Sequence, residues 1–409
     1  GLAPVRNRVE SGQGGKSTVN AIQASASAQA HSGEFRKWTW RGTVEMAKSN
    51  LLFGTGIGSY ELAYPRYTQT AFTAHAHNAY LQWAAEMGGL GVLLLFLPVA
   101  SLCAFALHIL HAHRQASLAG ETEAFRAEPF GLFSEPYVLL TGFFASLVAT
   151  LLHSLIDSDW YAVANAVTLA AVIGLMLSLA RYLAPDATKA PAPLPKMGLL
   201  LGVPLALILV WQGSSILNYR TALTSGNISL QSQKPQDALA DFQSASSALP
   251  YDPEAYLKQA LILGATEHPQ EAEQTLLTAT RIAPCGRTFY RLAQFYVKTK
   301  QPDKAIAAYE DSRRREPRNV QNLRALGDCY REAHRNDDAK HIYEIVSDLE
   351  QGVYGRVRAM PEMIESEFGF AHIGLADIAN ESKQWEEAAK EYHAAVNVFG
   401  EYWSNRTSG

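Results

Sequence analysis

Two histidines and an asparagine precede a long uncharged segment, and they are the residues best suited to acid–base chemistry. His75, His77 and Asn78 lie within Ala74–Gln82, shortly before Glu86. Imidazole is the side chain whose ordinary pKa suits proton removal near neutral pH. The run therefore predicts a general base, with His75 and Asn78 as candidate substrate-binding residues. The alternative is that His77 only helps to cap the following helix through Asn78.

Arginines upstream of these histidines could bind phosphate. Arg36 and Arg41 bound a short segment that leads into a predicted amphipathic helix through Lys48 and then into a glycine turn at Gly54–Gly58. A guanidinium stays charged at ordinary pH, and its planar fork matches phosphate oxygens. We therefore expect a base and a phosphate clamp in one loop, with Arg66 as a further candidate.

A second pair of polar residues follows later in the chain. His153 and Asp157 are four residues apart, a spacing that places two side chains on one face of a helix. The pair could join the substrate-binding site. It could equally do no more than anchor the turn Asp157–Asp159.

The elements that must position these residues include membrane-spanning helices. Four runs lack Lys, Arg, Asp and Glu, and they predict spans at about 88–110, 136–156, 160–180 and 197–217. A buried helix of a soluble protein is the alternative for any single run. The basic residues of loops 114–135 and 181–196 predict that these loops are cytoplasmic. Residues 1–86, the turn 157–159 and everything after 219 are then outside the cytosol.

The C-terminal part of the chain repeats. Alanines recur at intervals of 34, 33, 34 and 49 residues, each preceded by a small residue twelve positions earlier and followed by a large one four positions later. The alanines are Ala238, Ala272, Ala305, Ala339 and Ala388. Prolines at 250, 284 and 317 are expected to end second helices. The pattern is similar to tetratricopeptide repeats. The long last interval predicts an insertion or longer helices near 350–364.

Composition excludes several other classes of function. The 409 residues include 35 Lys and Arg and 39 Asp and Glu, a net charge of −4 that argues against nucleic-acid binding. Three scattered cysteines suit neither a disulfide scaffold nor a metal site, and no metal or cofactor is expected. Gly15–Thr18 lacks the first glycine of a phosphate-binding loop, and Gly54–Ser59 fails the dinucleotide fingerprint.

The loop as a whole resembles the signature loop of the O-antigen ligase and polymerase superfamily. The residues that carry the resemblance are Arg36, Trp40, Gly54–Tyr60, His77–Leu81 and Glu86–Gly91. The spacing of the family histidine from a following glycine is met by His77 and Gly88, whereas His75 would need glycine where Glu86 stands. Arg36 takes the place of the family arginine, with Trp40 where leucine is usual.

The resemblance implies a bacterial inner-membrane glycosyltransferase that acts without a metal. Such an enzyme moves a glycan from undecaprenyl diphosphate to a lipid or protein acceptor on the periplasmic side. His77 would be the general base, and Arg36 would neutralise the diphosphate leaving group, with Arg41 or Arg66 as helpers. Ligase, polymerase and protein O-oligosaccharyltransferase activities remain alternatives.

The expected architecture is all-α, with three domains. These are a catalytic loop at 1–86, four transmembrane helices within 87–219 and a repeat domain at 220–409, which could bind a protein partner. The start at Gly1 and the lack of a signal peptide predict that earlier helices precede this sequence. The competing function is a membrane-anchored tetratricopeptide scaffold for envelope proteins.

Overall fold

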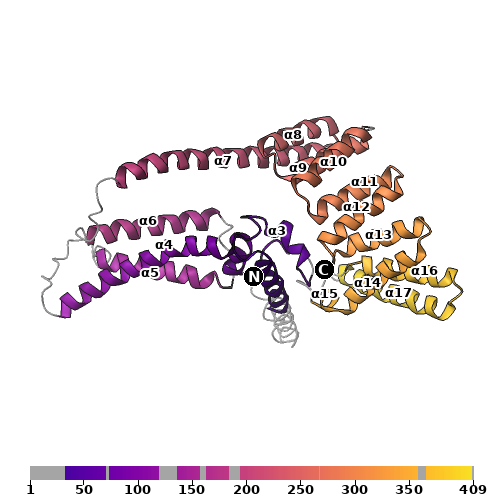
Figure 1. The fold of residues 1–409 in the computed structure, drawn as a ribbon, viewed down its shortest axis with the longest axis horizontal. Coiled ribbons are helices and arrows are strands. Elements are labelled where there is room, and N and C mark those ends of the chain that lie inside the picture. Colours follow the sequence, from indigo (N-terminus) through magenta and orange to yellow (C-terminus); the bar gives the residue numbers. More distant parts are fainter. Residues whose placement is uncertain are drawn as a thin grey trace, which may run out of the picture. The chain divides into compact units, whose positions relative to one another are not determined.

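The computed structural model describes residues 33–70, 73–118, 136–156, 163–183, 194–266, 268–357 and 365–407. Within these ranges every regular element is a helix, so the predicted all-α class is confirmed (Figure 1). The chain forms two compact units. One contains the described parts of 1–42, 62–73 and 211–409, and the other contains those of 43–61 and 74–210.

The first half of the chain carries both short and long helices. Residues 33–49 are helical, followed by α3 (Tyr60–Ala63), the 3-10 helix η1 (Tyr64–Arg66), α4 (Ala79–Leu118), α5 (Pro136–His153), α6 (Val163–Leu183) and α7 (Leu194–Gln231). The predicted amphipathic helix and the glycine turn after it are therefore both confirmed.

Two helices are long and apolar enough to cross a membrane, where the sequence predicted four spans. They are Ala79–Ala112, within α4, and Pro136–His153, which is α5. The third run falls in α6, where the described residues give the apolar stretch Val167–Ala180. The fourth predicted span, 197–217, falls in α7, where most side chains before Trp211 lie outside the described residues.

Helices α4, α5 and α6 share a small apolar core. It is formed by Leu102, Ala106 and Ile109 of α4, Leu140 and Leu147 of α5, and Met176 and Ala180 of α6. Outside this core the two candidate spans are mostly exposed, because only 11% of the most apolar 18-residue stretch of each span is buried. A core helix of a soluble protein buries most of its apolar side chains. The exposed leucine-rich surface of α4 therefore fits a lipid environment better than water.

The C-terminal half forms helix pairs of the predicted repeat type. The end of α7 pairs with α8 (Pro235–Ala248). The other pairs are α9 (Pro253–Ala265) with α10 (Pro269–Ile282), α11 (Gly286–Lys298) with α12 (Pro302–Arg315), α13 (Val320–Glu332) with α14 (Asn336–Gln351), and α16 (Glu367–Glu381) with α17 (Trp385–Thr407). The short helix α15 (Val353–Arg356) follows α14. The tetratricopeptide tail is confirmed.

Small residues allow the paired helices to approach, as the repeat pattern predicted. A Cβ at Gly226 would lie 2.5 Å from the Phe242 ring, and one at Gly327 would lie 2.4 Å from the Tyr343 ring. Tyr343 also fills the space beside Gly374 of the next repeat, where a Cβ would again lie 2.4 Å away. One aromatic ring therefore packs two successive repeats together.

Helix ends in the tail follow local sequence signals. Helices α8, α10 and α12 each begin with proline, which suits a first turn, and each ends two residues before one of the predicted turn prolines. In four repeats, the residue two positions after the end of the first helix has a left-handed backbone conformation. These residues are Gln233, Lys300, His334 and Lys383, with φ of 57°, 57°, 57° and 61°. This is the usual helix C-terminal conformation.

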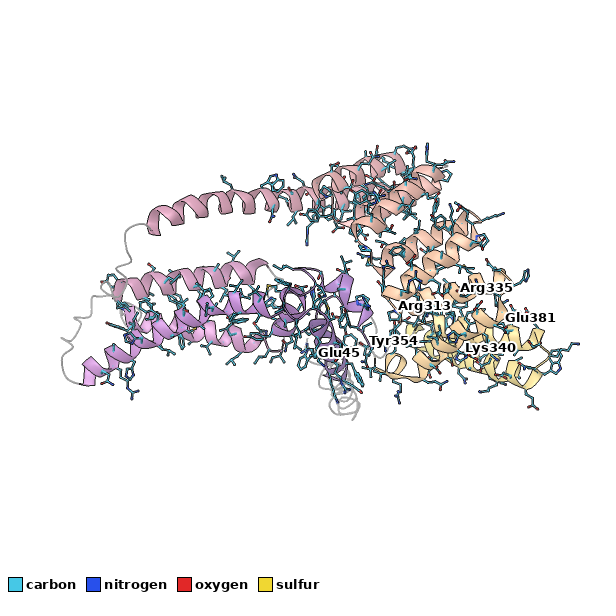
Figure 2. All side chains as sticks on the ribbon, in the orientation of Figure 1. Glu45, Arg313, Arg335, Lys340, Tyr354 and Glu381 are labelled. Atoms are coloured by element: carbon cyan, nitrogen blue, oxygen red, sulfur yellow. The ribbon has the colours of Figure 1, made fainter. Side chains whose placement is uncertain are left out.

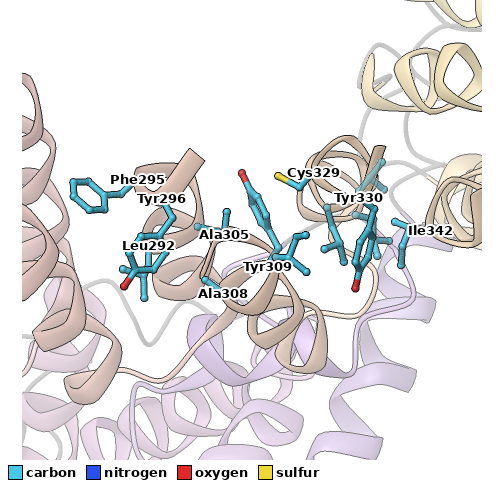
Figure 3. Close-up of a cluster of buried hydrophobic side chains, with 14 of the residues drawn as sticks. Leu292, Phe295, Tyr296, Ala305, Ala308, Tyr309, Cys329, Tyr330 and Ile342 are labelled. Atoms are coloured by element: carbon cyan, nitrogen blue, oxygen red, sulfur yellow. The ribbon is translucent and has the colours of Figure 1, made fainter. Parts of the chain in front are cut away.

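The tail is held by a continuous apolar core with charged side chains outside it. Leu292, Tyr309, Tyr330 and Ile342 are buried in successive helices of this core (Figure 3). On the outer surface, Arg335 lies 2.7 Å from Asp338 (Figure 2). The predicted insertion is seen in part as α15, whereas residues 358–364 lie outside the described residues.

Candidate active site

The first candidate span is broken at Gly88, and the glycine turn fills the break. Gly88 has φ 66° and ψ −178°, so the helical hydrogen-bond ladder of α4 is interrupted there. The N–H groups of Gly89 and Leu90 donate instead to the carbonyls of Leu51 and Leu52, at 2.7 and 3.2 Å. In the other direction, the N–H groups of residues 55 and 56 donate to the carbonyls of residues 85 and 86, at 3.0 and 2.8 Å. Four backbone hydrogen bonds thus replace those lost at the break.

Glycine is required on both sides of this contact. Gly54 has φ 67°, and a Cβ there would lie 2.3 Å from the carbonyl oxygen of Glu86. A Cβ on Gly88 would lie 2.4 Å from the carbonyl oxygen of Leu52. Both positions combine a left-handed backbone with a close approach of main chains, which only glycine tolerates. We refer to residues 51–56 and 85–90 as the glycine clasp.

His77 lies just before α4 in an unusual conformation. It is half-buried with φ 52°, and among the described non-glycine residues with positive φ it is the only one outside the helix ends of the repeat tail. Positive φ is uncommon for a side chain of this size. His75, two residues earlier, is also half-buried. The local backbone therefore fixes the position from which the His77 imidazole projects.

Asn78 joins the start of α4 to the end of α5. Its side-chain oxygen accepts a hydrogen bond from the N–H of Leu81 at 2.9 Å, and its amide donates to the carbonyl of Leu155 at 2.8 Å. The N–H of Ala79 also donates to the carbonyl of Ser154 at 3.0 Å. Asn78 is thus a helix N-cap, as the capping alternative proposed for this segment. The contacts bring the histidine segment beside the segment that follows His153.

The sequence predicted that His153 and Asp157 lie on one face of a helix, but α5 ends before Asp157. α5 ends at His153, whereas the sequence predicted a helix through 156. Residues 154–156 form a turn bonded to the start of α4, so the four-residue spacing no longer implies a shared face. His153 is exposed, and Asp157 lies outside the described residues.

Two buried polar side chains that the sequence analysis did not name as site residues hold the histidine segment. Gln82 and Glu86 are 1% and 2% exposed. Glu86 accepts a hydrogen bond from the N–H of Tyr60 at 3.0 Å, and Gln82 contacts the same carboxylate at 3.4 Å. Gln82 also accepts from the N–H of Ala76, between the two histidines, at 3.0 Å. The sequence signal that could have identified these two residues is their spacing of four positions next to an apolar run.

The candidate arginines belong to the other compact unit. Arg36 is half-buried on helix 33–49, and Arg41 is exposed, with its guanidinium 4.7 Å from the Trp38 ring centroid. Arg66 is exposed in η1. The preceding Tyr64 is fully buried and donates to the carbonyl of Thr39 at 3.4 Å.

Helix 33–49 therefore carries two candidate arginines and packs against the segment that carries the third. Gly42 makes this packing possible, because a Cβ there would lie 2.9 Å from the carbonyl of Tyr67. Among the described residues, no group of three or more His, Cys, Asp or Glu side chains is placed to hold a metal ion.

Two segments of the chain match known protein families. Residues 8–96 match the family described as O-antigen ligase, and the match includes the whole glycine clasp and His77. The chain carries an O-antigen ligase-like region. Residues 290–345 match the tetratricopeptide repeat family, so the ligase-like region is followed by a repeat tail. No curated protein matches the chain.

Three solved structures that are similar to this chain each cover less than half of it. "Crystal structure of MamA protein" is 16% identical, with 44% of this chain and 91% of that chain covered and a TM-score of 0.36. "MamA 41-end from Desulfovibrio magneticus RS-1" is 17% identical, with 44% and 94% covered and a TM-score of 0.36. "Crystal structure of YrrB: a TPR protein with an unusual peptide-binding site" is 16% identical, with 46% and 89% covered and a TM-score of 0.33. Scores this low carry no functional argument for the ligase-like region or its tail.

Proposed function

We propose that this chain transfers a glycan from undecaprenyl diphosphate to a lipid or protein acceptor at the outer face of a bacterial inner membrane. The observation that carries the proposal is His77, which has a left-handed backbone just before α4 and lies within the region that matches O-antigen ligase. Strained residues of this kind concentrate at functional sites. The repeat tail is then periplasmic, and the membrane helices form a multi-pass domain.

The proposed reaction inverts the configuration of the sugar carbon. His77 accepts the proton of an acceptor hydroxyl, and the oxygen attacks the anomeric carbon. The bond from that carbon to the diphosphate oxygen breaks, and the leaving group departs with its negative charge. Arg36 stabilises this charge, with Arg41 and Arg66 as further cations. His75, Asn78, His153 and Asp157 remain candidate substrate-binding residues. Gln82 and Glu86 act as positioning residues, since they accept hydrogen bonds from the backbone N–H groups of Ala76 and Tyr60.

Substitution of His77 by asparagine tests the base directly. Asparagine tolerates a left-handed backbone, so His77→Asn keeps the conformation but removes the imidazole. A general base typically contributes about 100-fold or more to the rate, so glycan transfer should fall by at least that factor at unchanged protein level. His111→Ala, at an exposed histidine of α4, is the control. Normal transfer by His77→Asn would remove His77 from the mechanism.

Arg36 is tested against its exposed neighbour Lys37 on the same helix. Arg36→Ala should reduce transfer by about 100-fold, the usual effect of losing one group that stabilises developing charge, whereas Lys37→Ala should have little effect. Equal effects of the two substitutions would show that general positive charge is sufficient, and Arg36 would have no specific role.

A membrane-anchored scaffold is the second candidate, because the repeat tail makes up nearly half of the chain and repeats of this class bind proteins. The two functions predict different phenotypes. If the chain is a scaffold, His77→Asn leaves surface glycan intact and only deletion of residues 220–409 disturbs the envelope. If it is a transferase, His77→Asn alone removes the glycan.

A further inference from the structure

An apolar tip projects from the loop that forms the glycine clasp. Leu51, Leu52, Phe53 and Ile57 are exposed by 67%, 67%, 73% and 83% of their surface, and we call these four residues the apolar tip. Single exposed apolar residues are common on proteins, but four within seven positions form a patch that needs an explanation.

The tip lies beside the beginning of the exposed surface of α4. The carbonyls of Leu51 and Leu52 accept hydrogen bonds from Gly89 and Leu90, so the tip is fixed at the level of these two residues. Leu90, Leu93 and Leu94 are themselves 44%, 58% and 63% exposed. The apolar tip is thus continuous with the surface of a helix that is long and apolar enough to span a membrane.

The backbone and charge of the loop are also suited to lipid. Non-helical chain is tolerated at membrane depth only when its N–H and C=O groups are bonded within the protein. The clasp supplies four such bonds, and the N–H of Gly54 donates to the carbonyl of Asn50 at 2.8 Å. The stretch from Ser49 to Tyr60 contains no Lys, Arg, Asp or Glu, although Lys48 and Glu61 stand at its two ends. Charged side chains are the ones that resist transfer into hydrocarbon.

We propose that the apolar tip inserts into the acyl region of the bilayer beside α4 and anchors the loop to the membrane. Removal of these side chains from water is favourable, and the clasp already holds them next to the lipid-facing surface of the helix. The anchor sets the depth of the loop relative to the span. Glu86 lies within the clasp and bonds to Tyr60 and Gln82, so the same depth is imposed on the histidine segment. The anchor does not depend on glycan transfer.

Quenching by spin-labelled lipids tests the insertion. The three cysteines, Cys103, Cys285 and Cys329, are replaced by alanine in the full chain. Single cysteines are then introduced by Phe53→Cys, Ile57→Cys, Leu94→Cys and Lys48→Cys and labelled with a small environment-sensitive fluorophore. Each protein is reconstituted into vesicles of phosphatidylethanolamine and phosphatidylglycerol, with or without lipid that carries a nitroxide high on its acyl chain.

Leu94→Cys reports the span, and Lys48→Cys reports the polar end of the neighbouring helix, where the lysine side chain is 61% exposed. Labels at positions 53 and 57 should be quenched like the label at 94 and about three-fold more than the label at 48. The proposal is overturned if 53 and 57 behave like 48 while 94 is quenched. It is equally overturned if labels at 53 and 57 report an apolar environment without quenching, because protein would then cover the tip. Lack of quenching at 94 would overturn the position of α4 in lipid and the tip with it.

All four exposed sites are on the surface, so the labelled proteins should fold. Transfer activity of each variant provides an independent check, since loss of activity with full quenching would leave the anchor intact and bear only on the proposed function. Loss of quenching with full activity would overturn the anchor and leave the proposed function intact.

Discussion

At the scale of single residues, His372 of α16 is a titratable side chain held between two carboxylates in the repeat tail. It is buried, with Nδ1 2.6 Å from an oxygen of Glu391 and Nε2 2.8 Å from an oxygen of Glu350. Burial lowers the pKa of the imidazole, but hydrogen bonds with Glu350 and Glu391 outweigh it, and the pKa is raised overall. Each ring nitrogen faces a carboxylate oxygen, and a charged imidazolium can donate to both.

The stability of the tail should therefore depend on pH through His372. Because its pKa is higher in the folded state, protonation stabilises the fold fully below the unfolded pKa of about 6.5, and this contribution is lost as pH rises through the folded pKa. Hydrogen exchange of α16 and α17 in the full chain should be accelerated by His372→Gln more at low pH than at high pH. His393→Gln, at an exposed histidine of α17, should show no such pH dependence. An equal effect of His372→Gln at all pH values would contradict the charged state.

At the scale of elements, the glycine clasp decides how the loop and α4 are joined. Gly54→Ala would place a Cβ against the backbone of Glu86, in addition to a left-handed strain that costs about 1 kcal/mol or more. Thermal unfolding of the detergent-solubilised chain should occur at a clearly lower temperature. Gly58→Ala is the matched control, since φ is +75° there but no atom lies within 4 Å of the new Cβ. If both substitutions lower the midpoint equally, backbone strain alone explains the effect and the close packing contributes nothing.

The elements also show why sequence reasoning succeeded for most helix ends but missed the end of one predicted span. Helix α12, for example, begins at Pro302 and ends two residues before Pro317, and such signals act within a few residues. The length of a charge-free run, by contrast, depends on composition and does not determine where a helix ends. The run at 136–156 was predicted to be helical throughout, but α5 stops at His153 because Ser154 and Leu155 bond to the start of α4.

At the scale of the whole molecule, one hydrogen bond joins segments 250 residues apart in the chain. Arg318 of the repeat tail donates to the carbonyl of Thr68 at 3.0 Å, just after η1 and Arg66, within the same compact unit. Hydrogen bonds from charged groups contribute about 1.5 to 3 kcal/mol. Arg318→Ala should therefore increase hydrogen exchange and proteolysis at residues 64–70.

Arg314→Ala is the control for this contact, because Arg314 is 61% exposed and pairs only locally with Asp311 in α12. If Arg314→Ala and Arg318→Ala loosen residues 64–70 equally, the bond to Thr68 does not hold the segment. If neither substitution affects the segment, its packing on helix 33–49 through Tyr64 is sufficient.

The sequence by itself determined the helical class, the repeat tail, the glycine turn and the ligase-like loop, because these depend on composition and on spacings that act over a few residues. Only the tertiary structure decided that Leu51 and Leu52 bond across the break at Gly88, that Asn78 joins α4 to α5, and that Gln82 and Glu86 hold the histidine segment. The physical reason is that backbone groups are chemically alike at every position. Which N–H meets which carbonyl across a distant contact is set by how close two chains can approach, and here that approach is permitted by the absence of a Cβ at Gly54 and Gly88.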